Sequence, residues 1–287
     1  MRRLRPTVVE VDLDAIRHNV RLLKPVDGEL MAVLKANAYG HGAVEVARAA
    51  LEAGATWIGV ALVEEGVSLR DAGIEAPILV LSEFPAGSER QALRAALTPS
   101  LYTGGGLQRL REAADGRRVD VHVKVDTGMH RVGVYPPESL NSYLDQVADE
   151  GFGLDAIWTH FADSAEDEKT TRRQLERFLG VVEGARAGGH VPRLLHAANS
   201  GATLLYPESH LSLVRCGIAV MGLEPAPGVG ASDGVARRTS SSSLDALSRR
   251  GAKHTEHQLP PVIPCGHGPG LSTNCCASAE VSASRWA

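Results

Sequence analysis

The sequence predicts an α/β protein whose main part is a (β/α)8 barrel of the TIM type. From residue 12 to about residue 225, short apolar runs alternate with amphipathic segments of helical length, which is typical of a parallel sheet with crossover helices. Eight such units within about two hundred residues match the size and repeat of this barrel. An open doubly wound sheet is the alternative. However, no G-x-G-x-x-G follows the early strands, so a dinucleotide-binding fold lacks its fingerprint.

The predicted strands are apolar on both faces, as expected for a parallel sheet that is covered on both sides. The first strand begins at Leu30 and ends just before Lys35. Together with this one, the predicted strand ranges are 30–34, 56–60, 77–81, 98–102, 119–125, 154–160, 193–196 and 212–216.

The predicted helices lie before and between these strands. Asp12 or Asp14 can cap a first helix, in which Ile16, Val20 and Leu23 share one face. The other helical ranges, several of which stop at a glycine, are 43–53, 61–72, 87–96, 105–115, 137–149, 168–187 and a weaker one near 200–206.

Composition divides the chain into a leading strand segment at 1–11, the barrel at 12–228 and a tail at 229–287. The tail has a four-serine run at 240–243, few large apolar residues and no sustained helical or strand period. Such a segment buries too little apolar surface to offset the entropy of ordering it, so we expect it to be mostly irregular. Its abrupt start predicts a reading-frame change, which sequencing the locus in all frames would test.

Charge and composition favour a cytoplasmic enzyme. A net charge of -4 gives no electrostatic case for nucleic acid or an anionic membrane. No apolar run approaches the ~18 residues of a membrane span, and no apolar segment follows the basic start to form a secretory signal. We expect no metal site, because the cysteines near the end of the chain lack a standard spacing. The alternative is a zinc site formed by Cys265, His267, Cys275 and Cys276.

Lys35 is the first candidate for chemistry, because it ends a barrel strand and a polar, glycine-bearing loop follows it at 36–42. Barrels of this type carry their active sites at the carboxyl ends of the strands. A desolvated or cation-flanked pocket lowers the pKa of a lysine and frees the lone pair that attacks a carbonyl. The alternative is a lysine that extends from the strand end into solvent.

Other polar residues follow later strands in the same way, and a barrel brings them all to one rim. Each has a structural alternative, such as a helix N-cap for Asn199, a hydrogen-bonded core histidine for His160 or a solvated charge for Arg131. Their common location favours a site instead. The set comprises Lys124, Asp126, Thr127, Met129, His130, Arg131, His160, His196, Asn199, Ser200, Arg215, Gly217 and Ile218.

A reactive lysine on the first strand, with hydroxyl and backbone N–H groups after the seventh and eighth, suggests an aldehyde cofactor that carries a phosphate. Barrels often bind phosphate at the late strands. Pyridoxal 5'-phosphate fits both requirements.

Five motifs resemble the signatures of bacterial alanine racemases. They cover the region from about residue 7 to residue 228 and are highly specific. The motifs are VLKANAYGHG at 33–42, HVKVDTGMHRVG at 122–133, THFA at 159–162, HAANS at 196–200 and VRCGI at 214–218.

The resemblance implies a role for each site residue in the interconversion of L-alanine and D-alanine, which supplies D-alanine for peptidoglycan. It implies that Lys35 holds pyridoxal phosphate through a Schiff base and serves as one of two bases at the substrate's α-carbon. Lys124 matches a lysine that the family carbamylates, and Arg131, with Met129 in the same loop, orients the substrate. The implied cofactor-binding residues are Tyr39, Ser200, Gly217 and Ile218 toward the phosphate, His160 near the ring, Arg215 opposite the pyridine nitrogen, and Asn199.

Arg215 has a physical rationale in this scheme. A guanidinium donates hydrogen bonds and does not deprotonate, so the pyridine nitrogen opposite it stays unprotonated and the ring withdraws electrons less strongly. This suits racemisation over transamination.

The chain departs from the resemblance after the barrel. The family places a β-rich domain there, which supplies a tyrosine as the opposite-face base and substrate contacts across a homodimer. The five tyrosines of this sequence are all at or before Tyr206. Losing one positioned acid or base costs roughly 10²–10⁴-fold in rate, so we expect turnover close to zero. Alternatives are a single-domain barrel for pyridoxal phosphate homeostasis and an inactive truncated remnant. Amino acid specificity and oligomeric state stay open.

Overall fold

The computed structural model describes residues 11–229. The predicted irregular tail at 229–287 and the alternative zinc site therefore lie outside the described residues, apart from residue 229 itself. The predicted leading strand segment at 1–11 does too, apart from Val11, which is in an isolated bridge.

The strands are all parallel and form two hydrogen-bonded sheets, with the orders β4-β3-β2-β1-β9 and β5-β6-β7-β8. Each predicted strand range overlaps an observed strand, and the range 98–102 overlaps both β4 and β5, so the expected order is confirmed. The strands are β1 (Glu29–Val33), β2 (Trp57–Val60), β3 (Ile78–Val80), β4 (Leu97–Thr98), β5 (Ser100–Leu101), β6 (Asp120–Lys124), β7 (Gly153–Trp158), β8 (Leu194–His196) and β9 (Leu213–Cys216).

Two junctions close these sheets into one barrel. Pro99 separates β4 from β5 within a single extended segment, and its carbonyl accepts from the His122 backbone N–H at 3.0 Å. At the other junction, the Ser212 N–H donates to Leu195 O at 3.1 Å and the Arg215 N–H donates to Ala198 O at 3.0 Å. Counting β4 and β5 as one strand gives the eight strand positions of a (β/α)8 barrel.

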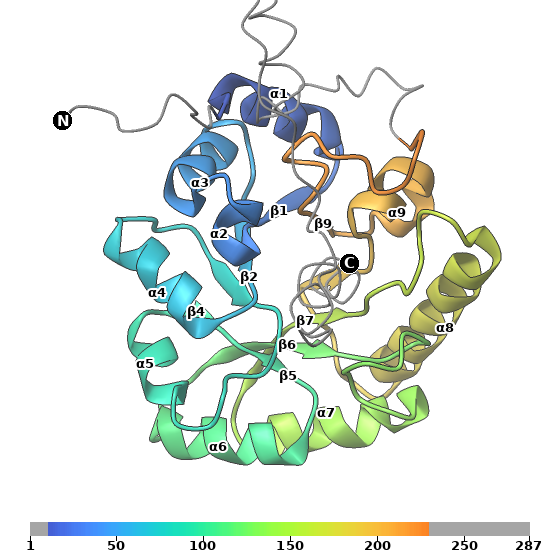
Figure 1. The fold of residues 1–287 in the computed structure, drawn as a ribbon. Coiled ribbons are helices and arrows are strands. Elements are labelled where there is room, and N and C mark those ends of the chain that lie inside the picture. Colours follow the sequence, from blue (N-terminus) through green and yellow to red (C-terminus); the bar gives the residue numbers. More distant parts are fainter. Residues whose placement is uncertain (1–10, 230–287) are drawn as a thin grey trace, which may run out of the picture. The chain divides into compact units, whose positions relative to one another are not determined.

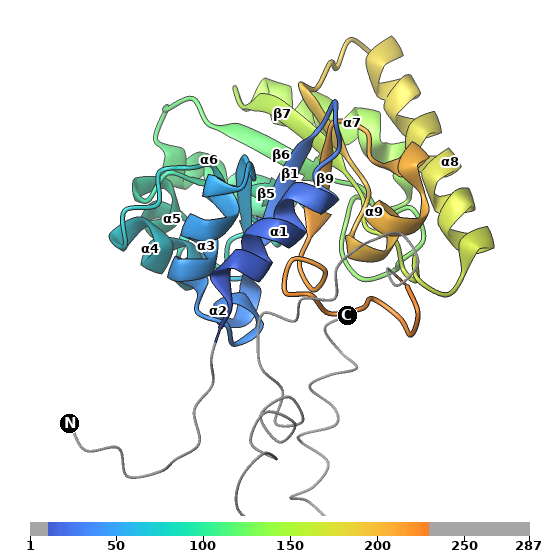
Figure 2. The same ribbon diagram turned by 90° about the horizontal axis from the view of Figure 1, so that it is seen from above.

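Helices surround the strands, as seen along the barrel in Figure 1 and from above in Figure 2. Asp12, rather than Asp14, caps the first helix by accepting from the N–H groups of Asp14 and Ala15. No helix in the described range is long and apolar enough to cross a membrane. The helices are α1 (Leu13–Leu23), α2 (Lys35–Tyr39), α3 (Ala43–Glu52), α4 (Val63–Asp71), α5 (Glu89–Arg94), α6 (Gly104–Ala114), α7 (Leu140–Asp149), α8 (Glu168–Ala187) and α9 (Ser200–Leu205), with 3₁₀ turns at Pro137–Ser139 and Pro207–Ser209.

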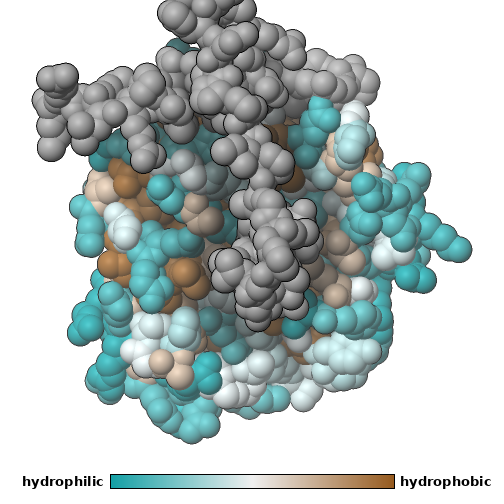
Figure 3. Space-filling model, in the orientation of Figure 1, coloured by the Kyte–Doolittle hydropathy of each residue, from teal (hydrophilic) through white to brown (hydrophobic). Residues whose placement is uncertain are grey.

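Alternation along the strands separates two apolar cores. Leu30 and Ala32 belong to a large cluster that includes helix residues, whereas Met31 and Val33 belong to a small cluster made of strand residues. The small cluster therefore fills the inside of the barrel. The helices turn their polar faces outward, and α8 carries mainly hydrophilic residues on the face shown in Figure 3. The small cluster is Met31, Val33, Trp57, Leu79, Ala156, Leu194 and Leu213.

The segment after Lys35 differs from the loop that the sequence predicts. Ala36, Asn37, Ala38 and Tyr39 form a left-handed turn, with φ between +52° and +54°. This conformation costs roughly 1–2 kcal/mol for each residue that is not glycine. Tertiary hydrogen bonds offset the cost: Glu65 Oε1 accepts from the Ala36 N–H at 2.6 Å, and Asn37 Oδ1 accepts from the Ala43 N–H at 2.8 Å.

Candidate active site

Lys35 stands at the carboxyl end of β1, as predicted, and is half-buried. Burial and the nearby charge of Arg131 lower the pKa of its amine, while Glu65 opposes the shift. Its Nζ lies 5.7 Å from the centre of the Tyr39 ring. The amine therefore loses its proton more readily than an ordinary lysine, which is the property that a carbonyl-attacking group needs.

The hydroxyl groups of Tyr39 and Ser200 meet the start of the segment after β9. A Cβ atom at Gly217 would lie 2.3 Å from Tyr39 Oη, so the close approach requires glycine there. Ser200 Oγ accepts from the N–H groups of Gly217 at 3.1 Å and Ala219 at 3.3 Å. Ile218 lies between these two residues. The structure thus brings together two hydroxyls and two backbone N–H groups, a donor set suited to a phosphate.

Asn199 holds the start of α9, the helix that begins at Ser200. Its side chain caps α9 by accepting from the Ala202 N–H at 3.0 Å, and it also shares a hydrogen bond with Ser164. The structural alternative considered for Asn199 is therefore realised. Its predicted contact with a cofactor stays a prediction.

Arg215 is fully enclosed inside the barrel. Its guanidinium donates to Thr159 O at 2.7 Å and Ala197 O at 3.0 Å, and contacts His160 Nδ1 at 3.2 Å and His196 Nδ1 at 2.9 Å. Burial lowers its pKa to about 9, so it stays charged at neutral pH. Because arginine only donates, both histidine Nδ1 atoms must act as acceptors.

Lys124 is also buried, at the end of β6. Burial, followed by the charges of Arg131 and Arg215, lowers its pKa to about 7, against an opposing effect of Asp126. Its Nζ lies 4.6 Å from the centre of the Trp158 ring. A large fraction of this amine is therefore unprotonated at neutral pH.

The loop after β6 is shaped by Asp126. Its Oδ1 accepts from the N–H groups of Gly128, Met129 and His130 at 2.9, 2.9 and 3.1 Å. This turn delivers Arg131 to the rim, where its charge acts on both lysines. Met129 is partly buried in the same turn.

His160 lies close to four basic side chains of the site. Burial, followed by the charges of Arg215, Lys124, Arg131 and Lys35, lowers its pKa well below the ordinary value. We therefore treat it as neutral. Its position within reach of all four charges shows that the strand ends do bring these predicted residues to one place.

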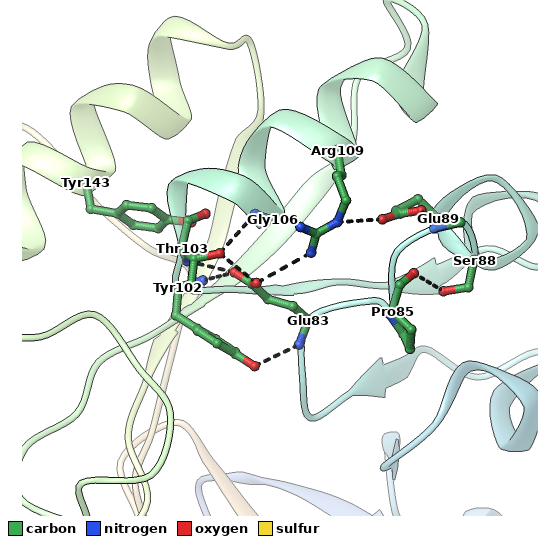
Figure 4. Close-up of polar contacts among 10 residues, drawn as sticks. Glu83, Pro85, Ser88, Glu89, Tyr102, Thr103, Gly106, Arg109 and Tyr143 are labelled. Carbon is green, nitrogen blue, oxygen red and sulfur yellow. Dashed lines mark hydrogen bonds and ion pairs between the residues drawn. The ribbon is translucent and has the colours of Figure 1, made fainter.

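A second charged cluster occupies the rim after β3 and β5 (Figure 4). Glu83 accepts from the N–H groups of Tyr102 at 2.8 Å and Thr103 at 2.7 Å, and from Thr103 Oγ1 at 2.8 Å. Arg109 lies between Glu83, at 3.9 Å, and Glu89, at 2.9 Å. The arrangement holds the start of α6, and it places the positive charge of Arg109 next to two negative charges.

Sequence reasoning missed two residues of the site region and a third, Asp155, that lies toward the other end of the barrel. Glu65 supports the Lys35 turn, Trp158 packs under Lys124 and Arg215 at 4.6 and 4.8 Å, and Asp155 lies inside an otherwise apolar strand. A carboxylate within a buried parallel strand was the available signal for Asp155. Glu65 is the third residue of α4, three positions after the N-cap Leu62, which is the usual place for a capping glutamate.

Comparison with known proteins gives one consistent result. The model of the alanine racemase N-terminal domain matches residues 11–225. The alanine racemase of Symbiobacterium thermophilum is 48% identical over 238 residues, which are 79% of this chain and 61% of that protein. The alanine racemase of Frankia casuarinae is 36% identical over 297 residues, covering 94% of this chain and 76% of that protein, so this match extends beyond residue 229.

Solved structures agree. Alanine racemase from D-cycloserine producing Streptomyces lavendulae has a TM-score of 0.72 and 40% identity, covering 79% of this chain and 62% of that one. Alanine racemase from Bacillus anthracis with bound L-Ala-P has a TM-score of 0.74 and 37% identity, covering 79% of this chain and 60% of that one. The chain spans about 60% of the length of most of the relatives it matches.

Proposed function

The chain belongs to the alanine racemase family through its N-terminal domain, and on that premise we propose that it binds pyridoxal 5'-phosphate at Lys35. We further propose that the whole protein interconverts L-alanine and D-alanine. The observation that carries the proposal is the half-buried amine of Lys35, with its lowered pKa, at the rim that also holds the donor set of Tyr39, Ser200 and Gly217.

The residues present fit this cofactor. The hydroxyls of Tyr39 and Ser200 and the N–H groups of Gly217 and Ala219 can hold a phosphate, and Gly217 supplies the space that any side chain would fill. Bound pyridoxal phosphate supplies a conjugated ring that acidifies the proton on the substrate's α-carbon. Arg215 would face the ring nitrogen as a hydrogen-bond donor that does not give up its proton.

The proposed chemistry assigns proton transfer at the α-carbon to Lys35. Its lowered pKa lets the amine take a proton near neutral pH. Arg131 and the other cations at the rim attract the carboxylate of an amino acid. Inversion needs a second group on the opposite face, and we assign none among residues 11–229. The family homodimer and the identity of the second group remain proposals for the whole protein.

Lys124 is proposed to be modified as a carbamate. Only the neutral amine reacts with carbon dioxide, and the pKa of about 7 makes that form abundant at neutral pH. The change converts a cation into an anion beside Arg131, so it replaces a repulsion by an attraction.

Binding is tested by adding pyridoxal phosphate to the purified chain and recording visible absorbance. We expect a new band that Lys35→Ala abolishes and that Lys169→Ala, at an exposed position on α8, leaves unchanged. Absence of the band in the unmodified protein would overturn the binding proposal.

The role of Lys35 is tested separately in heavy water with each enantiomer of alanine. A single base on one face exchanges the α-proton of one enantiomer and returns that same enantiomer. We therefore expect one-sided deuterium incorporation, with formation of the mirror image close to zero. Rapid inversion would show that a second base exists in the chain, and exchange that survives Lys35→Ala would remove Lys35 from this role.

A further inference from the structure

A line of polar side chains crosses the apolar inside of the barrel. Arg215 Nη1 lies 2.9 Å from His196 Nδ1, and His196 Nε2 lies 3.1 Å from His122 Nδ1. His122 Nε2 lies 3.0 Å from Asp155 Oδ2, and Asp155 is clamped by Arg193 at 2.7 and 3.0 Å. We call these five residues the relay. It connects the candidate site to the start of β8, at the other end of the barrel.

A β-bulge brings Asp155 into the relay. Along β6 and β7, Val121 pairs with Leu154 and His122 pairs with Ala156, so Asp155 is an extra residue without a partner in the register. Bulges are rare in parallel pairs, and they redirect a side chain. Here the bulge places a carboxylate beside a histidine that is fully buried.

The relay has one direction. Arginine only donates, so His196 Nδ1 must accept and its proton must be on Nε2. His196 Nε2–H then donates to His122 Nδ1, which puts the His122 proton on Nε2, where it faces the acceptor Asp155. The two ends therefore demand the same tautomer of both rings, and burial, which lowers the pKa of each histidine, keeps both neutral.

The relay also links opposite charges. No carboxylate within residues 11–229 forms an ion pair with Arg215, although a buried charge is costly without compensation. At the far end, Arg193 contacts both Asp155 and Glu29. Two carboxylates and one guanidinium leave a net charge of one negative unit there. Hydrogen bonds aligned in one direction polarise one another, and so connect that charge with Arg215.

We infer that Asp155 is a positioning residue of the candidate site, which fixes the orientation of the Arg215 guanidinium through His122 and His196. Trp158 stacks on His196 with ring centres 5.4 Å apart, and Trp57 packs on His122 with ring centres 4.9 Å apart, so each histidine ring is held by a tryptophan. The consequence for a cofactor ring rests on the proposed function. The orientation of Arg215 does not.

The test is ¹⁵N NMR of histidine and arginine side chains in the full chain without cofactor. We expect both relay histidines to carry a single proton on Nε2, and the Arg215 side-chain N–H protons to exchange slowly. In Asp155→Leu, the buried His122 Nε2–H loses its acceptor, so the His122 proton should no longer be confined to Nε2. Exchange of the Arg215 side-chain N–H protons should become roughly tenfold to a hundredfold faster. Asp155→Asn, which keeps an acceptor oxygen, should restore most of both signals.

The chain offers a matched control. His190 and Asp145 form a surface pair with the same 3.0 Å separation, so Asp145→Leu should change His190 and leave Arg215 as it was. Arg193 is exposed, so Arg193→Leu provides a second variant that keeps the fold. It should disturb His122 at a less acidic pH than in the unmodified protein, because Asp155 then protonates more easily.

Unchanged His122 and Arg215 signals in folded Asp155→Leu would overturn the inference, as would protons on Nδ1 in the unmodified protein. If Asp155→Leu fails to fold, Arg193→Leu decides. His122 signals that stay unchanged in Arg193→Leu down to the lowest pH at which the protein is folded would also overturn the inference. Because these measurements need no cofactor, they can fail while the cofactor band is present, or succeed while it is absent.

Discussion

Two charged regions on the same rim of the barrel behave in opposite ways. In the region of Figure 4, Arg109 lies between Glu83 and Glu89, so unlike charges are neighbours. In the candidate site, the cations Lys35, Lys124 and Arg215 share one enclosed region with the charge of Arg131, and the pKa of each of the first three is lowered. The first arrangement holds a helix in place. The second lowers the pKa of its amines and concentrates positive charge in one place.

The difference shows how a fold divides its tasks. Like charges close together in a low-dielectric site destabilise the folded state. Such a site persists because interactions elsewhere in the fold offset this destabilisation. The hydrogen bonds and ion pair of Glu83 are among these stabilising interactions. We therefore expect substitutions in the Glu83 region to change stability and substitutions among the cations to change chemistry.

The largest effect is expected from Glu83→Ala. The change removes an acceptor of three hydrogen bonds from a side chain that is 10% exposed. Urea unfolding should show a loss of roughly 2–4 kcal/mol, because two backbone N–H groups lose their partner. The exposed pair of Arg111 and Glu150 is the control, and Glu150→Ala should change stability by less than about 0.5 kcal/mol. Loss of the cofactor absorption band in a folded Glu83→Ala variant would contradict this division, because it would assign a role in cofactor binding to the Glu83 region.

Gly217→Ala comes next, on the other side of the comparison. The new Cβ would lie 2.3 Å from Tyr39 Oη, so the tyrosine has to move away from the proposed phosphate position. Affinity for pyridoxal phosphate, measured by titrating the absorption band, should fall roughly tenfold to a hundredfold. Gly180→Ala is the control, because nothing lies within 4 Å of a Cβ there. Unchanged affinity in Gly217→Ala would show that the phosphate binds elsewhere.

Arg131→Leu should shift the pH dependence of cofactor attachment. After burial, the charge of Arg131 is the next cause of the lowered pKa of Lys35 and Lys124. Removing it raises both pKa values, so the reactive neutral amine appears only at higher pH and the midpoint of band formation moves upward. Arg118, which is 82% exposed, provides the control Arg118→Leu. A midpoint that stays in place, or moves downward, would contradict the assigned electrostatics.

The smallest effect is expected on acid stability. Burial opposes ionisation of Asp155, but hydrogen bonds from His122 and Arg193 lower its pKa to about 2, below the ordinary 3.8. A lowered pKa stabilises the fold above the ordinary value, and this contribution is lost as pH falls toward 2. Arg193→Leu raises the pKa, so unfolding free energy measured from pH 5 downward should fall less steeply than in the unmodified protein. Arg111→Leu should leave the slope unchanged, and an unchanged slope in Arg193→Leu would remove Arg193 from this role.

The barrel was predictable because its signal is local. Each strand is a short apolar run that ends at a polar residue or glycine, so β1 and β6 ended at the predicted residues within one position. Parallel strands place their carboxyl ends on one rim, and this rule alone gathered Lys35, Lys124 and Arg215. The predicted roles of these residues toward a cofactor and a substrate remain to be tested by the experiments above.

Two backbone features could not be predicted. The left-handed turn at Ala36–Tyr39 runs against the preference of its two alanines and its tyrosine, and Glu65, distant in sequence, supports it by accepting from its first N–H. The bulge at Asp155 depends on the pairing of β7 with β6. Both features are decided by contacts between elements, which a pattern along one element does not contain.

The sequence by itself determined the order of strands and helices, the rim that holds the candidate site and the family to which the motifs belong. These follow from periodicity and from residue type at strand ends, which are properties of neighbours along the chain. Only the tertiary structure decided which amines are desolvated, which histidine nitrogens accept and which side chains connect Arg215 with Asp155. Desolvation and electrostatic fields depend on distances in space, and folding alone brings Asp155, His122, His196 and Arg215 into one line.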